Sequence, residues 1–112
     1  MAVMVSSTTA LSVAANSKSS DQVSGQYQYS GKGRYTLYAK ASATGLNVTC
    51  AVGGIALIND LPIADTGTAG TLSTADNMQV SQLMNGGRVE LTFRNTTGAA
   101  ITVDSKLLFD PA

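Results

Sequence analysis

Short runs in which apolar and polar residues alternate recur along most of the chain. The clearest two span 88–94 and 99–109, on either side of the polar sequence Asn95-Thr-Thr-Gly98. Alternation with a period of two is typical of a strand that buries one face, and two such runs around a polar turn predict a β-hairpin. We therefore expect 88–94 and 99–109 to pair with each other.

A second pair of runs, 26–30 and 34–40, flanks the sequence Gly31-Lys-Gly33. Glycine readily adopts the positive φ angles of tight turns. This arrangement predicts a second hairpin.

The middle of the chain predicts further strands and one long loop. Residues 46–52 place their apolar side chains, including that of Cys50, on one strand face, and we expect this thiol to act as a small buried hydrophobe. The apolar run 55–58 predicts the next strand, ended by a turn at Asn59-Asp60 and Pro62. Residues 64–74 are small and polar, and predict a loop or a weak edge strand. Residues 73–84 fit a strand or a short helix with a Ser or Thr cap, and we favour strand or loop.

The N-terminal residues 1–20 carry a single charge, Lys18, and a weak period of two. This pattern predicts an extended segment, for which two interpretations stay open. The segment is an arm that adds a strand to a neighbouring subunit's sheet, or it is an edge strand of the chain's own sheet. Residues 21–112 then form the compact domain.

Together these runs give about seven or eight short strands, with turn signals roughly every 8–12 residues. The sequence therefore predicts an all-β protein. We expect an antiparallel β-sandwich that is jelly-roll-like, with an extended N-terminal arm. The chain has no room for the long alternating helices of an α/β fold, and its 112 residues are enough for a single core.

The composition argues against catalysis and against strong nucleic-acid binding. The chain has no His, no Trp and one Cys, so it lacks an imidazole base for a nucleophile and the usual ligands of zinc. Seven Lys and Arg balance seven Asp and Glu, and only 12% of residues are charged. Phosphate binding needs clustered cations, whereas a charge-poor surface favours self-association. The sequence contains no run of about 18 apolar residues, so it predicts no membrane-spanning helix.

Two sets of carboxylates are candidates for chemistry. Glu90 and Asp104 could form the acid pair of a glycoside hydrolase, although we favour a surface ladder of ion pairs with nearby Arg and Lys. Asp60, Asp65 and Asp76 could contribute oxygens to calcium, although solvated loop carboxylates are the better interpretation. We therefore expect no catalytic residue, no metal site, no cofactor and no small-molecule substrate.

All four tyrosines lie within twelve residues of one another, at 27–38. Cross-strand aromatic pairs over the core are the first interpretation, a protein interface the second and a sugar-stacking platform the third. We expect Tyr27, Tyr29 and Tyr35 to share one face of the second hairpin. The candidate residues for an assembly interface, from the N-terminal segment and this cluster, are Val3, Val5, Leu11, Val13, Tyr27, Tyr29, Tyr35 and Tyr38.

Residues 84–109 resemble the closing strands of small viral and phage coat domains. The shared features are the strand led by Gly86-Gly87, the turn Asn95-Thr-Thr-Gly98 and the return strand, in a chain rich in Ala, Thr, Ser and Gly. The resemblance implies a capsid coat or cement protein, located in the virion, that assembles with copies of itself or with other capsid proteins. The basic N-terminal arm of coat proteins that package RNA is missing, which favours protein–protein contacts. The alternatives are a carbohydrate-binding or adhesive β-sandwich, and a filament subunit joined by strand donation from residues 2–13.

Overall fold

Eight β-strands form from the part of the chain that the computed structural model describes, which is residues 3–23, 29–63, 66–67, 72 and 77–111. No helix occurs among these residues. The predicted all-β antiparallel sandwich is therefore confirmed. The strands are β1 (Val3–Val13), β2 (Tyr29–Ser30), β3 (Gly33–Ala41), β4 (Leu46–Val52), β5 (Ile55–Pro62), β6 (Met78–Met84), β7 (Gly87–Asn95) and β8 (Ile101–Pro111).

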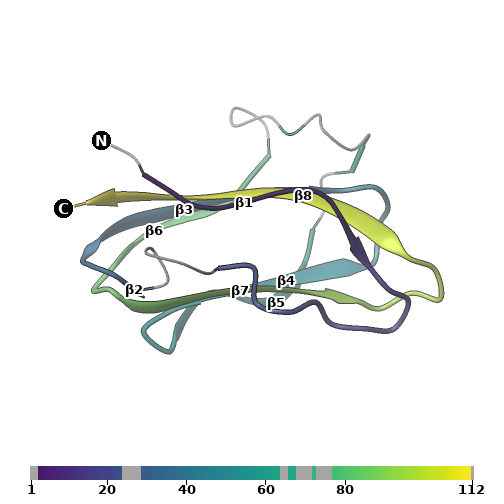
Figure 1. Cartoon of the computed structure of the whole chain (residues 1–112), viewed down its shortest axis with the longest axis horizontal. Helices are drawn as coiled ribbons and strands as arrows, with labels where there is room; N and C mark the ends of the chain where they lie inside the picture. Colours follow the sequence, from purple (N-terminus) through teal and green to yellow (C-terminus); the bar gives the residue numbers. More distant parts are fainter. Residues whose placement is uncertain (1–2, 24–28, 64–65, 68–71, 73–76, 112) are drawn as a thin grey trace.

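The strands lie in two four-stranded antiparallel sheets that face each other (Figure 1). The first sheet has the order β1-β8-β3-β6, and the second has the order β2-β7-β4-β5. The pairing follows one rule: β1 pairs with β8, β2 with β7, β3 with β6 and β4 with β5. The chain therefore runs back along itself as a folded ribbon, and this ribbon wraps around a single core.

Both predicted hairpins are wrong, although strands form within all four runs; of the run 26–30 only Tyr29–Ser30 lies in the described part of the chain. β7 and β8 belong to different sheets, and so do β2 and β3. Each connection crosses from one layer to the other instead of turning within a layer. Two strands that face each other across a core show the same alternation as two strands that pair side by side. The local pattern therefore predicts the strands but not their partners.

The connection between β7 and β8 is held by Asn95, whose side chain is only 1% exposed. Its amide nitrogen donates to the carbonyl oxygens of Val13, at 3.0 Å, and Ala99, at 2.7 Å. Its amide oxygen accepts from the backbone N–H of Thr97, at 2.9 Å, and from the Thr97 hydroxyl, at 2.8 Å. One buried side chain thus joins the end of β1, the end of β7 and the connection to β8.

The predicted turn at 59–62 is also wrong, because these residues continue β5. Asp60 adopts a φ of 50°, and the pairing of β5 with β4 shifts register here. The Asp60 N–H donates to the Thr49 hydroxyl at 3.0 Å. The turn-forming residues therefore make a bulge in a strand, where one extra residue is accommodated without ending the pairing. The segment 73–84, by contrast, forms a strand over Met78–Met84, in line with the preference for strand or loop, and its residues 73–76 lie outside the described part of the chain.

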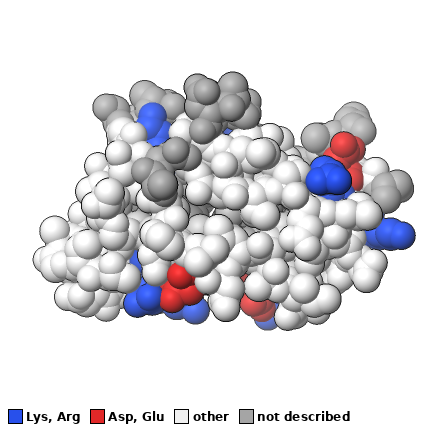
Figure 2. All heavy atoms as spheres, turned by 180° about the vertical axis from the view of Figure 1, so that it is seen from behind, with Lys and Arg blue, Asp and Glu red and all other residues white. Residues whose placement is uncertain are grey.

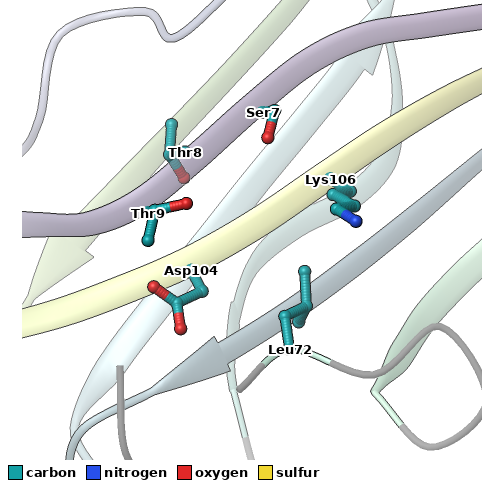
Figure 3. Close-up of a pocket in the computed structure, with 6 residues that line it drawn as sticks. All are labelled: Ser7, Thr8, Thr9, Leu72, Asp104 and Lys106. Atoms are coloured by element: carbon teal, nitrogen blue, oxygen red, sulfur yellow. The ribbon is translucent and has the colours of Figure 1, made fainter. Parts of the chain in front are cut away.

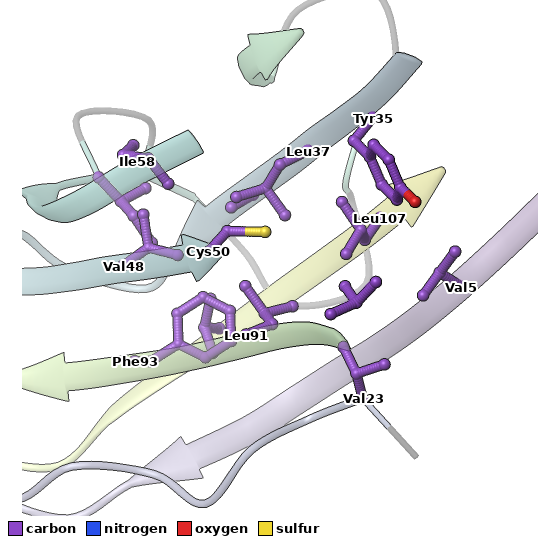
Figure 4. Close-up of a cluster of buried hydrophobic side chains, with 14 of the residues drawn as sticks. Val5, Val23, Tyr35, Leu37, Val48, Cys50, Ile58, Leu91, Phe93 and Leu107 are labelled. Carbon is purple, nitrogen blue, oxygen red and sulfur yellow. The ribbon is translucent and has the colours of Figure 1, made fainter. Parts of the chain in front are cut away.

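The core fills the space between the sheets with the inward side chains of β3, β4, β7 and β8 (Figure 4). The four alternating residues of β4 are buried as predicted, and Cys50 lies among them. Burial raises the pKa of the Cys50 thiol to about 12, with a smaller contribution from the charge of Asp21. The thiol therefore stays protonated and packs as a small apolar group.

β1 pairs with β8 of its own chain, so the N-terminal segment is an edge strand of the first sheet. Val5 and Val13 are buried in the core. The register shifts at Val5 and again between Thr8 and Leu11, and the stretch between these shifts places Ser6 and Thr8 opposite the inward residues Leu107 and Ser105. The Ser6 hydroxyl donates to the Gln22 carbonyl oxygen at 3.0 Å, and the hydroxyls of Thr8 and Ser105 are hydrogen-bonded at 2.6 Å. The inward polar groups are thereby satisfied.

Candidate assembly surface

The outermost strands are β1 and β6 in the first sheet, and β2 and β5 in the second. An outermost strand presents backbone N–H and C=O groups that can pair with another chain. β2 has only two residues. The strand edges that matter for assembly are therefore those of β1, β5 and β6.

One flank of the sandwich, between β1 and β7, is closed by the segment 16–23. Its backbone N–H groups donate to β7 from Ser19 to the Phe93 carbonyl oxygen, at 2.7 Å, and from Gln22 to the Leu91 carbonyl oxygen, at 2.8 Å. Two of its side chains cap β7 in return. The Ser19 hydroxyl accepts from the Phe93 N–H at 2.9 Å, and an Asp21 carboxylate oxygen accepts from the Leu91 N–H at 3.0 Å. These bonds occupy the edge of β7 along this flank.

We call the opposite flank open because no segment among the described residues covers it, and β5 and β6 lie next to each other along it. These strands lie behind β1 in Figure 1, so Figure 2 views the flank that they form, and its charged atoms lie at the lower rim, at one end and at one place on the upper edge. β6 contains no charged residue, and Asp60 is the only one in β5. Large apolar side chains are exposed here in both strands: Ile55 at 60%, Leu61 at 53%, Met78 at 55% and Leu83 at 53%.

The outward face of the second sheet is different, because its charges are paired. Arg94 binds the Asp60 carboxylate through two nitrogens, at 3.0 and 2.7 Å, and Arg88 contacts Glu90 at 3.0 Å. The hydrogen bond from Arg94 holds the pKa of Asp60 below its ordinary value. Ion pairs as exposed as these contribute little to stability.

The candidate acid pair does not form. Glu90 lies on β7 and Asp104 on β8, so the two carboxylates belong to opposite sheets. Glu90 is outside the core on the second sheet, paired with Arg88. Asp104 alternates with the core residues Val103 and Ser105 and so lies on the outer face of the first sheet. Two carboxylates on opposite sides of a sandwich cannot act on one glycosidic bond.

A small pocket lies beside Asp104 on the outer face of the first sheet (Figure 3). Its volume is about 170 Å³, and its lining residues are Ser7, Thr8, Thr9, Leu72, Asp104 and Lys106. A carboxylate oxygen of Asp104 accepts from the Ala10 N–H at 2.7 Å, where β1 adopts a φ of 52°. Asp104 is only 3% exposed. This arrangement assigns the carboxylate to holding the kink in β1.

The tyrosine cluster is dispersed, so the expected shared face is wrong. Tyr35 is fully buried, its ring packs on Phe109 with 4.8 Å between ring centroids, and its hydroxyl donates to the Gly31 carbonyl oxygen at 2.7 Å. Tyr29 is 69% exposed and pairs within the second sheet, opposite Arg88. Tyr38 is half-buried on the outer face of the first sheet. Tyr27 lies outside the described residues.

The apolar residues proposed for the N-terminal interface face inward. Val5 and Val13 are buried, whereas Val3 and Leu11 are partly buried. Filament formation by strand donation would require β1 to leave β8.

The sequence analysis did not propose the exposed apolar side chains of β5 and β6 as an interface. A signal for those of β6 is present in the sequence, because Met78–Met84 is an apolar and amide-rich strand without a charge.

Among the described residues, no group of His, Cys, Asp and Glu is arranged to hold a metal ion. Of the proposed calcium ligands, Asp60 is paired with Arg94, and Asp65 and Asp76 lie outside the described residues. The described part of the chain also contains no helix long and apolar enough to span a membrane. The chain matches no family model, and comparisons with curated proteins and with solved structures found no relative.

Proposed function

We propose that this protein is a structural, non-enzymatic subunit of a virion, acting as a coat or cement protein through protein–protein assembly. The observation that carries the proposal is the pairing of β1 with β8, β2 with β7, β3 with β6 and β4 with β5. We interpret this pairing, in two four-stranded sheets, as that of a jelly roll, the architecture of many viral capsid subunits. It agrees with the resemblance of residues 84–109 to coat domains.

The open flank supports the same proposal from a different direction. A fold alone serves many functions, so the argument needs a surface. Exposed apolar side chains from two neighbouring strands, with almost no charge between them, are typical of a surface that another protein covers. In a closed shell each such contact is repeated by symmetry, so contacts that are individually weak hold the lattice together.

The charge distribution favours contacts with protein over contacts with the genome. The chain has seven basic residues and no net charge. Arg88 and Arg94 are already paired with carboxylates on the face of the second sheet. A surface that releases counterions from nucleic acid needs several unpaired cations close together. We therefore place the protein in the protein layer of the shell.

A carbohydrate-binding module is the second candidate, because jelly rolls also form lectin domains and Tyr29 is 69% exposed. A solvent-exposed aromatic ring can stack on a sugar. This function predicts binding to a glycan array that is lost in a Tyr29→Ala variant and retained in Tyr38→Ala. Glycan binding of this kind by a monomeric protein would replace the assembly proposal.

Sedimentation velocity and electron microscopy of the purified protein test the assembly proposal. We expect the particle mass to rise with protein concentration, and regular oligomers or shells to appear. An Ile55→Lys/Leu61→Lys variant, which places two charges on the open flank, is expected to associate less than the parent protein. Ser12→Lys, on the exposed side of β1, is the matched control. A parent protein that stays monomeric at millimolar concentration would contradict the proposal.

A further inference from the structure

We infer that the edge of β6 pairs with β6 of a second copy of this chain, antiparallel about a two-fold axis. The first sheets of the two copies then join into one continuous sheet. This inference rests on the proposed function and specifies the contact through which the subunits meet. It follows from a comparison of the three long outermost strands.

β1 and β5 both carry features that prevent pairing with another chain. β1 shifts register twice and kinks at Ala10, where φ is 52°. β5 also shifts register twice, and it contains the charged Asp60 and ends at Pro62. Bulges, charges and proline are the means by which proteins keep edge strands from adding to one another.

β6 has none of these features over most of its length. Its sequence, Met78-Gln-Val-Ser-Gln-Leu-Met84, contains no charge, no proline and no glycine. Its register with β3 is unbroken from Val80 to Met84, and the one irregularity lies before Val80. No described strand lies beyond it in the sheet. β6 is therefore the outermost strand that is suited to accept a partner.

The sequence of β6 suits a second copy as that partner. Antiparallel pairing centred on Ser81 places Met78 opposite Met84, Gln79 opposite Leu83 and Val80 opposite Gln82 of the other copy. Every facing pair is apolar or uncharged, so no like charges meet. A two-fold axis also uses the same edge on both subunits, so both β6 edges are occupied and neither is left for a third chain.

The nearest cation among the described residues, Arg34, opposes this pairing, and the uncharged facing pairs must offset its repulsion. Arg34 on β3 lies beside β6 and donates to the Ser81 hydroxyl at 3.3 Å. With neighbouring strands about 4.8 Å apart, the two β3 strands in the joined sheet are roughly 14 Å from each other. The two guanidinium groups lie closer together than these strands, because each reaches the Ser81 hydroxyl beside the two-fold axis, so their mutual repulsion is a cost that salt lowers.

A charge-swap experiment tests this contact. Gln82 is exposed, and in the proposed pair the two copies of this residue are diagonal neighbours, about 7–8 Å apart. We expect Gln82→Lys alone and Gln82→Glu alone each to weaken association at least about fivefold by sedimentation, because like charges are brought together. An equimolar mixture of the two variants is expected to recover association, because opposite charges then meet. Ser12→Lys is the control on another strand edge, and circular dichroism verifies that each variant folds.

A Ser81→Cys variant tests the register without adding charge. Residue 81 faces its own copy across the axis, so mild oxidation is expected to give a disulfide-linked dimer, which the parent protein with its buried Cys50 does not give. If the parent protein assembles but the Gln82 variants assemble equally well and the Ser81→Cys variant does not cross-link, the β6 contact is wrong and the proposed function stands. If the parent protein never assembles, both proposals fall.

Discussion

Replacement of Asn95 by Ala tests the connection that closes the ribbon of strands. The buried side chain makes four hydrogen bonds, to the Val13 and Ala99 carbonyl oxygens and with the N–H and hydroxyl of Thr97. A hydrogen bond contributes about 1 kcal/mol net, and a buried group left without a partner costs more. In the variant the single proton of the Thr97 hydroxyl, which no longer has the Asn95 oxygen as acceptor, can go to the Ala99 carbonyl oxygen at 2.9 Å, and this reduces the loss. We therefore expect Asn95→Ala to lower the free energy of unfolding by about 3 kcal/mol.

This loss is large against the stability of about 5–15 kcal/mol that is typical of a domain. It corresponds to a fall of roughly 12 °C in the melting temperature, at about 4 °C per kcal/mol for a chain of this length. Urea denaturation followed by far-ultraviolet circular dichroism measures the free energy directly. Asn47→Ala is the matched control, because Asn47 is half-exposed and its amide donates a long hydrogen bond, of 3.3 Å, to the Asp60 carbonyl oxygen at the surface. Its effect is expected to stay within about 0.5 kcal/mol.

An Asn95→Asp variant separates hydrogen bonding from packing. Aspartate keeps the oxygen that accepts from Thr97, but it directs a second oxygen at the Val13 and Ala99 carbonyl oxygens. The ionised form is therefore repelled, and we expect this variant to be less stable than Asn95→Ala at neutral pH and to recover as acid protonates the carboxyl. A loss below about 1 kcal/mol in Asn95→Ala would refute the role assigned to this side chain.

Three further predictions follow from single positions. Because burial raises the Cys50 pKa from 9.0 to about 12, thiol reagents should label it only after unfolding. Stability should also fall by up to about 1.4 kcal/mol per pH unit between those values, a slope absent from Cys50→Ala. Gly53→Ala should cost about 2 kcal/mol more than Gly54→Ala in urea denaturation. Both glycines have positive φ, but a Cβ at Gly53 meets the Gly86 carbonyl oxygen at 2.5 Å, whereas Gly54 faces open space; equal losses would contradict this. Asp104→Ala should cost about 2 kcal/mol by freeing the Ala10 N–H, whereas an unchanged melting temperature would show that Asp104 does not hold the kink.

The strands could be predicted from the sequence because the alternation of apolar and polar residues within each strand reflects which of its side chains are buried. The alternation in β3, β4 and β7 is visible in the printed residues and reappears as alternating burial. The pairing could not be predicted in the same way. Whether β7 turns back beside β8 or crosses to the opposite sheet depends on contacts such as that of Asn95 with Val13, which are 82 residues apart in the chain.

The candidate surface was harder to predict than the fold. The sequence proposes Val5 and Val13 for an interface because they are apolar and lie in an extended segment. Apolar side chains are also favourable in the chain's own core, and both residues are buried there. The same holds for Tyr35, which packs on Phe109. Exposure depends on a strand's place in the sheet, and Met78 and Leu83 are exposed because β6 comes last in its sheet.

The two flanks of the sandwich differ in whether the chain covers the strand edges on them, and this difference supports an assembly role for the open flank. On the closed flank, the chain uses the side chains of Ser19 and Asp21 as well as backbone groups to occupy the edge of β7. On the open flank, the chain has the same supply of Ser, Thr and Asp, yet no described segment covers β6. An uncharged edge left in this state is an aggregation hazard for a free monomer. It is an advantage for a subunit that meets its own copies, because the edge that would be a liability in isolation is covered as soon as the assembly forms.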